Sequence, residues 1–204
     1  MSRIFAFLAG VAVTATLTLG IGTAFSQDGQ EPSSEEMAKM MLQAEKYTKP
    51  GPHHEWLGQL VGSWESETRL FMGNQATPPE KGTTEISWLM EGRFLKMEGH
   101  GSLMGMPMDS FYILGYDNFK QSYVTCAVNS IETALRTSEG DIDPRTGALI
   151  AYGTIDEYLT GEHDKMVKYV YRLPSPDKLV IEVHDLPIGE TGTKVIEMTF
   201  NRKK

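Results

Sequence analysis

The stretch DKLVIEVHD, residues 177–185, decides the fold class of this chain. Leu179, Ile181 and Val183 take every second position, and the residues between them are polar except for Val180. A period of two is typical of a β-strand that buries one face and exposes the other. We therefore predict a strand whose three alternating apolar side chains point into a core.

The same period continues through most of the chain after residue 63. Ten short segments alternate in this way, and turns rich in Gly, Pro, Asp and Asn separate them. This pattern predicts an all-β antiparallel meander, and closing it into a barrel removes the exposed edges of so large a sheet. The predicted strands are residues 64–71, 83–90, 93–103, 110–116, 121–129, 133–141, 148–155, 165–173, 178–185 and 193–202.

Alternation also assigns the faces of other strands. A side chain that shares the parity of apolar neighbours is predicted to face the barrel interior, and one that shares the parity of charged neighbours is predicted to face outward. Besides the three residues of the opening stretch, those predicted to face inward are Trp64, Ser66, Thr68, Leu95, Met97, Ile196, Met198 and Phe200.

The N-terminus predicts export from the cytoplasm. Residues 1–26 hold one basic residue, Arg3, followed by an uncharged apolar run, as is typical of a secretory signal peptide. Small residues place the expected cleavage after Ser26, and cleavage after Ala24 is an alternative. The run is also long enough to stay as a membrane anchor, so the sequence leaves this choice open.

Three further segments follow the predicted signal peptide. The polar residues 27–34 include Gly and Pro and predict a flexible linker. Apolar residues then recur at helical spacing, which predicts an N-terminal helical segment over residues 35–62. The period of two marks the β-barrel domain, residues 63–204.

Charge and cysteine content limit the partners. The formal net charge of the 204 residues is −8, and it becomes −9 without residues 1–26, whose only charged residue is Arg3. Nucleic acid and anionic lipid attract basic patches, so we expect no nucleic-acid partner and no stable membrane association after signal cleavage. Cys126 is the only cysteine, so packing instead of an internal disulfide must stabilise the fold. The oligomeric state does not follow from the sequence.

The segment GSWESE, residues 62–67, resembles the Gly-x-Trp opening of lipocalin-type (calycin) barrels. In those barrels the tryptophan of the first strand packs against a basic residue of the last strand. Arg202 shares the inward parity of Phe200, so the resemblance implies that Trp64 and Arg202 stack where the barrel closes. Gly62, Trp64 and Arg202 are therefore predicted structural residues. Trp64 and Arg202 are expected to form a cation–π contact of roughly 0.5 to 2 kcal/mol.

A longer resemblance covers nearly the whole chain after the signal peptide. The strings LVGSWESE, GRFL, GMP, LGYDN and SEGDIDPRTGAL are similar to the bacterial family called domain of unknown function 1579. This resemblance implies a lipocalin-like β-barrel without a settled activity, so it supplies no catalytic residues. Met108 stands where the family's string leads us to expect an aromatic residue.

The barrel interior is the predicted place for a ligand, because small barrels either fill with side chains or leave room for one small molecule. Trp88, Tyr112 and Tyr116 have inward parity, and so does Arg93. Aromatic walls with a fixed polar group are typical of small-molecule sites, so these four are the predicted residues for binding a small apolar molecule. The alternative is a filled barrel that serves as a structural or interaction module.

The stretch HGSLMGMPMDS, residues 100–110, raises a metal hypothesis. Thioethers favour Cu(I), and strand parity predicts that His100, Met104 and Met106 share one outward face. The simpler interpretation is a hairpin turn formed by residues 105–107, because Pro cannot donate to a strand ladder and Gly supplies backbone freedom. We therefore predict the turn and no metal site.

No catalytic motif occurs in the chain. There is no Gly-x-Ser-x-Gly elbow and no nucleotide-binding glycine loop, and HHEW (53–56) lacks the second, spaced His of a zinc-protease helix. We expect no enzymatic activity and no cofactor. Haem is a minor alternative, because His163 falls in a predicted turn and His184 on a predicted outward face.

Overall fold

The computed structural model of the chain describes residues 33–73, 75–158, 160–186 and 193–204. The chain divides into two units, residues 1–46 and 47–204. The predicted signal peptide (1–26) and residues 27–32 of the predicted linker lie outside the described residues. Neither described helix combines the length and the hydropathy that a bilayer crossing needs.

Helix α1 (Ser34–Thr48) forms most of the described part of the first unit. It begins with a capping box, in which the Glu36 N–H donates to Ser33 Oγ at 3.3 Å and the Ser33 N–H donates to Glu36 Oε2 at 2.8 Å. None of its residues is buried.

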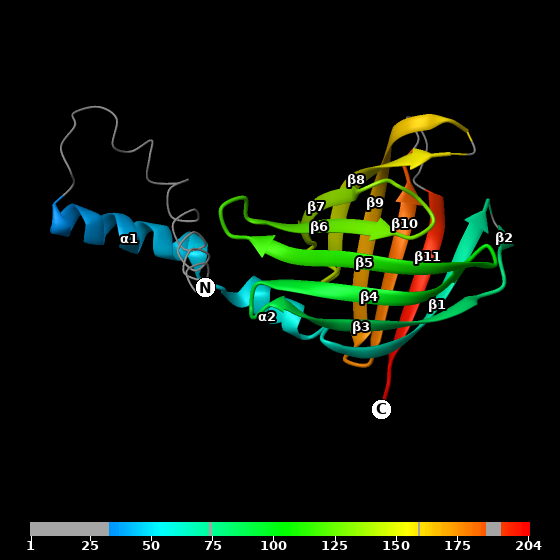
Figure 1. Ribbon diagram of the computed structural model, residues 1–204, viewed down its shortest axis with the longest axis horizontal. Coiled ribbons are helices and arrows are strands. Elements are labelled where there is room, and N and C mark those ends of the chain that lie inside the picture. Colours follow the sequence, from blue (N-terminus) through cyan, green and yellow to red (C-terminus); the bar gives the residue numbers. More distant parts are fainter. Residues whose placement is uncertain (1–32, 74, 159, 187–192) are drawn as a thin grey trace, which may run out of the picture. The chain divides into compact units, whose positions relative to one another are not determined.

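Ten antiparallel strands close into one barrel, as the sequence predicts (Figure 1). Successive barrel strands are paired, and the last strand returns to pair with the first. A two-residue strand, β2, pairs only with the end of β1. The strands are β1 (Gly62–Met72), β2 (Gln75–Ala76), β3 (Glu80–Met90), β4 (Phe94–Leu103), β5 (Met106–Asp117), β6 (Ser122–Asn129), β7 (Arg136–Ile142), β8 (Leu149–Glu157), β9 (Glu162–Ser175), β10 (Lys178–Asp185) and β11 (Thr193–Arg202).

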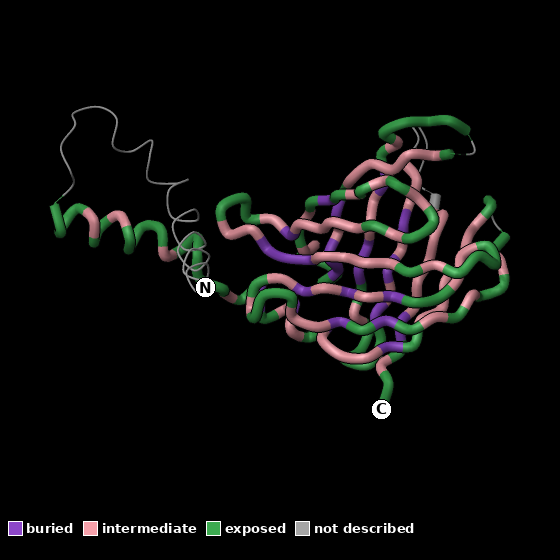
Figure 2. Tube along the Cα trace, viewed as in Figure 1, coloured by how far each residue is buried: buried purple, intermediate pink, exposed green. Residues whose placement is uncertain are grey.

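Helix α2 (Pro52–Gly58) covers one end of this barrel, which we call the closed end (Figure 1). Leu57 and the following Leu60 are fully buried there, in one apolar cluster with Trp64. Figure 2 shows how buried residues recur along the strands while most turns are exposed. The opposite end, where β3 begins and β4 ends, is called the open end below.

The predicted contact between Trp64 and Arg202 is confirmed. The two residues are direct partners in the β1–β11 register, and the Arg202 guanidinium lies 4.1 Å from the centre of the Trp64 ring. Trp64 is completely buried, and its indole N–H donates to the Leu60 carbonyl at 3.0 Å. The indole is therefore fixed from both sides at the line where the barrel closes.

Arg202 also connects this closing line to the helix and to a turn. Its Nη1 and Nη2 donate to the carbonyls of Val61 (2.5 Å) and Gln59 (2.8 Å), just after α2. Its Nε donates to the Pro176 carbonyl at 3.0 Å, in the turn between β9 and β10. Gly62 has φ +144°, and a Cβ there would lie 2.3 Å from Nη1. Only glycine leaves room for this arginine.

The predicted faces of the barrel are confirmed where burial tests them. In β10, Leu179, Ile181 and Val183 are all at most 5 % exposed, and in β4 the same holds for Leu95 and Met97. The inward parity of β11 likewise holds, since Phe200 is 5 % exposed.

The turn within residues 100–110 differs from the prediction. Met104 (φ +55°) and Gly105 (φ +74°) form the two-residue connection, whereas Met106 and Pro107 already belong to β5 and pair with β4. Two positive φ angles give the twist that a tight antiparallel hairpin needs. Pro107 is tolerated near the start of β5, at the rim of the sheet.

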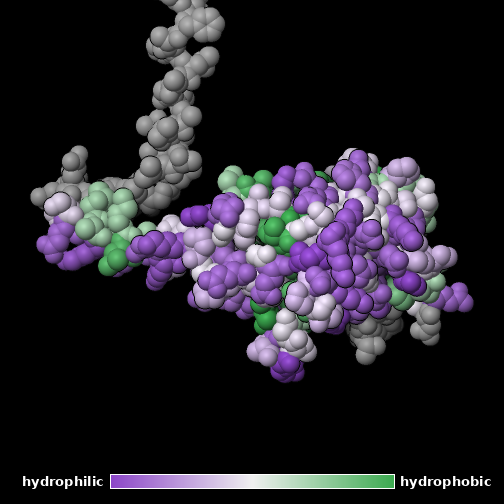
Figure 3. All heavy atoms as spheres, turned by 90° about the horizontal axis from the view of Figure 1, so that it is seen from below, coloured by the Kyte–Doolittle hydropathy of each residue, from purple (hydrophilic) through white to green (hydrophobic). Residues whose placement is uncertain are grey.

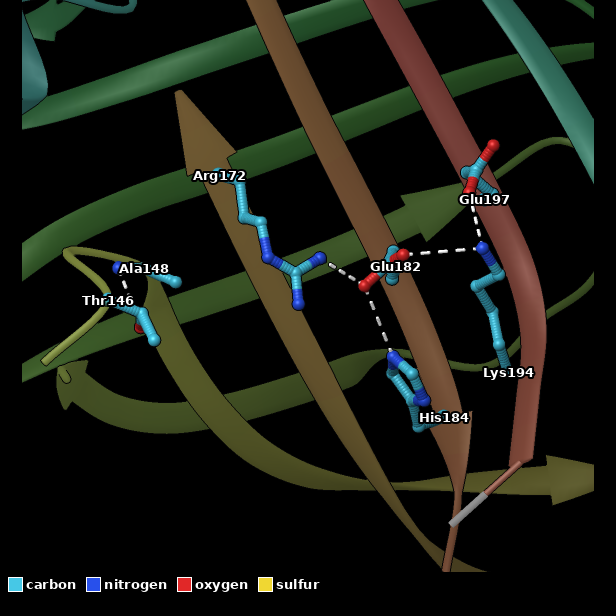
Figure 4. A network of polar contacts seen from close by, with 7 residues as sticks. All are labelled: Thr146, Ala148, Arg172, Glu182, His184, Lys194 and Glu197. Carbon is cyan, nitrogen blue, oxygen red and sulfur yellow. Dashed lines mark hydrogen bonds and ion pairs between the residues drawn. The ribbon is translucent and has the colours of Figure 1, made fainter. Parts of the chain in front are cut away.

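A polar network joins the outer faces of the last three strands (Figure 4). At its centre, Glu182 of β10 accepts hydrogen bonds from Arg172 of β9 and from Lys194 of β11, and His184 Nε2 lies 3.3 Å from its Oε2. The Lys194 ammonium also lies 4.6 Å from the ring centre of Phe71, in β1. This network therefore bridges four consecutive strands on the outside of the barrel.

We expect the change Arg202→Met to lower the free energy of unfolding by about 3 kcal/mol, because it removes a cation–π contact and several charge-assisted hydrogen bonds. Urea unfolding followed by Trp fluorescence would measure this loss. The neighbouring change Lys203→Met is the control, and it should alter stability by about 0.5 kcal/mol or less because Lys203 is exposed. Equal effects of the two changes would contradict the role given to Arg202.

The network also predicts a pH dependence. Burial opposes ionisation of Glu182, but its hydrogen bonds to Arg172 and His184 and the nearby cations outweigh burial and lower its pKa from 4.5 to about 2. The unfolded chain therefore binds a proton that the folded chain does not, so this stabilisation is complete above pH 4.5 and is lost as the pH falls toward 2.

Glu182→Gln should accordingly destabilise the protein by about 2 to 3 kcal/mol at pH 6, and the difference from the parent should shrink by about 2 kcal/mol at pH 3. Urea unfolding at both pH values would measure it. Glu65→Gln, at an exposed glutamate of β1, should show no such pH-dependent difference.

Candidate functional site

The barrel encloses a cavity of about 170 Å³ in the half away from α2. Its walls come from the first residues of β3 and β5 and the last residues of β4, together with facing segments of the other barrel strands. Lys81 and His100, both exposed, belong to the rim, so the cavity meets solvent at the open end. At the closed end, large apolar side chains pack into the core instead.

Small residues form one side of the cavity. Gly82 and Gly99 lie in strands β3 and β4 with no side chain to fill the interior, and Ser110 of β5 stands beside them. A Cβ at Gly82 would lie 2.7 Å from the backbone carbonyl oxygen of His100, so the close strand approach requires glycine there. The buried Thr84 adds a hydroxyl to the same side, and no described residue is its hydrogen-bond partner.

Larger side chains form the other side. Tyr169 and Tyr171 of β9 stand among aliphatic residues of the last three strands, and Tyr112 comes from β5. Tyr171 is only 6 % exposed, and Tyr112 and Tyr169 are partly buried. Burial raises the pKa of all three phenols, so their hydroxyls are protonated at neutral pH. The apolar residues that line the cavity with them are Met97, Leu103, Met108, Ala127, Ile155, Ile181, Val183, Ile196, Met198 and Phe200.

One ion pair borders the cavity. Arg136, in the first position of β7, donates from Nη2 to Glu132 Oε2 at 2.6 Å. Glu132 is also the acceptor of a short hydrogen bond from the Asn129 side chain. The Arg136 Nε is buried and has no acceptor among the described residues. An arginine can face this interior because Glu132 compensates its charge.

Glu80 holds the hairpin at the rim of the cavity. Its carboxylate accepts hydrogen bonds from Ser102 Oγ at 2.5 Å and from the N–H groups of Met104 and Gly105 at 2.6 and 3.1 Å. These bonds, the one from Ser102 above all, lower the pKa of Glu80 below its usual 4.5. The start of β3 thus fixes the β4–β5 turn at the open end.

Of the four predicted ligand-binding residues, only Tyr112 lines this cavity. Trp88 lies at the closed end and packs beside Gly58 of α2. Tyr116 is buried there too, and its ring stacks on His53 with 4.0 Å between ring centres. Arg93 is exposed in the turn before β4, where its Nη2 donates to the Thr48 carbonyl at 3.3 Å.

These three placements have two physical causes. Trp88 and Tyr116 do have inward parity, but they stand at the level of the barrel that α2 covers. Arg93 precedes the first residue of β4, Phe94, so strand alternation does not apply to it.

Tyr169, Tyr171 and Arg136 are among the cavity residues that the sequence reasoning missed. Tyr169 and Tyr171 alternate with Lys168 and Arg172, and this parity could have revealed them. Arg136 could not be found in this way, because a charged side chain is expected to face outward.

The hypotheses of metal and haem binding gain no support from the geometry. His100 pairs with Asp109, and its Nδ1 lies 2.8 Å from Asp109 Oδ1, whereas Met106 has the parity of the cavity-lining Met108. The prediction that His100 and Met106 share a face is therefore wrong, because the tight turn shifts the register of β5. Among the described residues no group of three or more His, Cys, Asp or Glu could hold a metal ion.

Comparison with known proteins places the chain in a family. Residues 49–202 match the family described as protein of unknown function (DUF1579). The chain belongs to this family. The match covers α2 and the whole lipocalin-like barrel, including the Trp64 and Arg202 pair. No curated protein matches the sequence.

Solved structures similar to this DUF1579 chain share its fold. Rv2717c from M. tuberculosis superposes with a TM-score of 0.54 at 13 % identity, over 76 % of this chain and 100 % of its own. The S-type phycobiliprotein lyase CPES from Guillardia theta gives a TM-score of 0.51 at 13 % identity, over 85 % of this chain and 99 % of its own. At such identity these likenesses show the barrel alone.

The contacts of Glu80 predict how firmly the rim hairpin is held. Glu80→Gln removes the charge that three donors share, so the protection of the Met104 and Gly105 amides against hydrogen exchange should fall by about tenfold. In the parent, protection corrected for intrinsic exchange should be full at neutral pH and should decrease as the pH falls below 4.5 and Glu80 becomes protonated.

Exchange measured by NMR tests both statements. Glu85→Gln is the matched control, since Glu85 lies on the same strand but accepts from Ser63, away from the hairpin. A hairpin whose two amides exchange equally in both variants would contradict the role of Glu80.

Proposed function

We propose that this DUF1579 protein binds one small, compact and mainly apolar molecule inside its barrel. The observation that carries the proposal is the cavity of about 170 Å³ at the open end, lined by aromatic and aliphatic side chains with a few polar groups. Small-molecule sites have this composition. Export to a periplasmic or extracellular space, and the absence of a catalytic role, belong to the same proposal and rest on the sequence alone.

The volume limits the size of the ligand. An engineered protein cavity of about 150 Å³ accommodates benzene, whereas sites for drug-sized molecules span about 300 to 1,000 Å³. A molecule with one ring and a short substituent therefore fits the space, and a macrocycle such as haem does not. Among the described wall residues the only histidine is His100, an exposed rim residue, which also disfavours haem.

A filled barrel acting as an interaction module receives less support. The interior contains space, and the face of the barrel shown in Figure 3 is mostly hydrophilic. Exposed apolar side chains such as Phe119 and Leu135 do occur, but they lie in separate turns.

The proposal predicts that toluene binds inside the barrel and that filling the cavity prevents it. Ala127 lines the cavity, so Ala127→Phe should weaken toluene binding at least about tenfold by occupying the space. Ligand-observed NMR would measure the affinity, and thermal unfolding at increasing toluene concentration would show stabilisation of the parent but not of Ala127→Phe.

The adjacent change Val128→Phe is the control, because Val128 is 40 % exposed on the outer face of β6. It should leave toluene affinity unchanged. Ala127→Leu offers a smaller filling variant if the phenylalanine disturbs the fold. Failure of the parent to bind toluene, or equal binding by Ala127→Phe and Val128→Phe, would refute a ligand site in the barrel.

A further inference from the structure

We infer that the cavity selects neutral ligands that carry a hydrogen-bond acceptor, such as the carbonyl oxygen of a small aromatic or aliphatic ketone, held by the tyrosine hydroxyls beside Arg136. This inference rests on the proposed function, since it specifies the ligand of the same site. The volume and the apolar lining alone do not determine how polar the ligand is.

The first observation is a group of polar atoms without partners. Among the described residues, no hydrogen-bond partner exists for the hydroxyl of Tyr112, Tyr169 or Tyr171, although all three line the cavity. Tyr171 is 94 % removed from bulk solvent, so its hydroxyl faces the confined space of the cavity. An acceptor on a ligand in that space would give this hydroxyl the partner that the described chain does not supply, in a hydrogen bond worth about 0.5 to 1.5 kcal/mol.

The tyrosines form one electrostatic cluster with the ion pair. The Arg136 guanidinium and the Glu132 carboxylate act on both Tyr112 and Tyr169, and these two act in turn on Tyr171. The register places Tyr112, Ala127 and Arg136 in one row across β5, β6 and β7. Polar groups of β5 and β7 therefore lie in one row of the cavity wall, and the charges of the ion pair reach Tyr169 of β9 as well.

Donors exceed acceptors in this cluster. Arg136 has five N–H donors and no acceptor, and only its Nη2 is hydrogen-bonded within the described chain, to Glu132. The Glu132 carboxylate already accepts from Arg136 and from Asn129. The phenols are protonated and can each donate. The group that a ligand must supply is consequently an acceptor.

The charge balance favours a neutral acceptor over an anion. Glu132 lies 2.6 Å from Arg136, so the pair presents no net positive charge to the cavity. At the rim the charges of Glu80 and Lys81 offset each other, and the chain as a whole is acidic at −8. A carboxylate would lose its hydration without gaining a free cation, which is unfavourable in an apolar cavity.

Paired probes of equal shape test this inference. Acetophenone and cumene differ chiefly in a carbonyl oxygen against a methyl group, and benzoate adds the charge. With the full parent chain, NMR titration should give acetophenone at least about fivefold tighter binding than cumene, and benzoate the weakest binding of the three. Tyr171→Phe should reduce the acetophenone preference by about fivefold and leave cumene binding unchanged or tighter, and Tyr112→Phe provides a second variant.

Two controls separate the tyrosines from other hydroxyls. Thr84→Val removes an unpartnered lining hydroxyl from β3, and Tyr152→Phe removes an exposed one from β8; both should keep the preference. Three outcomes would overturn the inference while leaving the binding site in place. The first is equal affinity for acetophenone and cumene, and the second is tighter binding of benzoate. The third is loss of the acetophenone preference in Thr84→Val but not in the tyrosine variants. Binding of none of the three probes would instead refute the proposed function.

Discussion

The fold depends on one guanidinium group. A meander of ten strands becomes a barrel only when its last strand pairs with its first, and Arg202 stabilises that pairing by stacking on Trp64. The same group bonds to the chain after α2 and to the β9–β10 turn, so three segments meet on it. Lysine could not replace it, because a point charge cannot stack on a ring and donate in several fixed directions at once. Gly62 is required for the same reason, since any side chain would occupy the place of the guanidinium.

The position of the cavity follows from this closure. Arg202 and Trp64 tie α2 to one end of the barrel, and the apolar side chains beneath the helix fill that half. In the other half, β3 and β4 contribute glycines to the interior. The ends of one barrel therefore differ in role: packing at the closed end stabilises the fold, and the open end retains space. Glu80 fixes the rim hairpin without filling that space.

Sequence alone predicted the fold better than the site, because alternation reports only the direction of a side chain. It correctly gave ten strands and the inward faces that burial tests, although the face of Met106 was wrong, and the lipocalin resemblance gave the partner of Trp64. Alternation could not separate Tyr112 from Tyr116, which face the same interior but stand four residues apart, roughly 13 Å along a strand. That distance places Tyr112 in the cavity and Tyr116 in the core under α2. The position of the turn was the other limit. Alternation does not indicate where a strand ends, so it did not predict that Met104, with its positive φ, belongs to the turn.

Arg136 shows why the chemistry of the interior needs the structure. Its inward position contradicts the rule that charged side chains face water, and it is tolerated because Glu132, four residues earlier in the β6–β7 connection, meets it at 2.6 Å. Such a spacing in a sequence suggests a helical pair, whereas here a loop carries one partner and a strand the other. The pairing cancels the charge but leaves donors in excess, so an interior with a formal cation becomes suited to a neutral acceptor. A contact between a turn and a strand thus sets the charge of the cavity, while the tyrosines of its walls supply further donors.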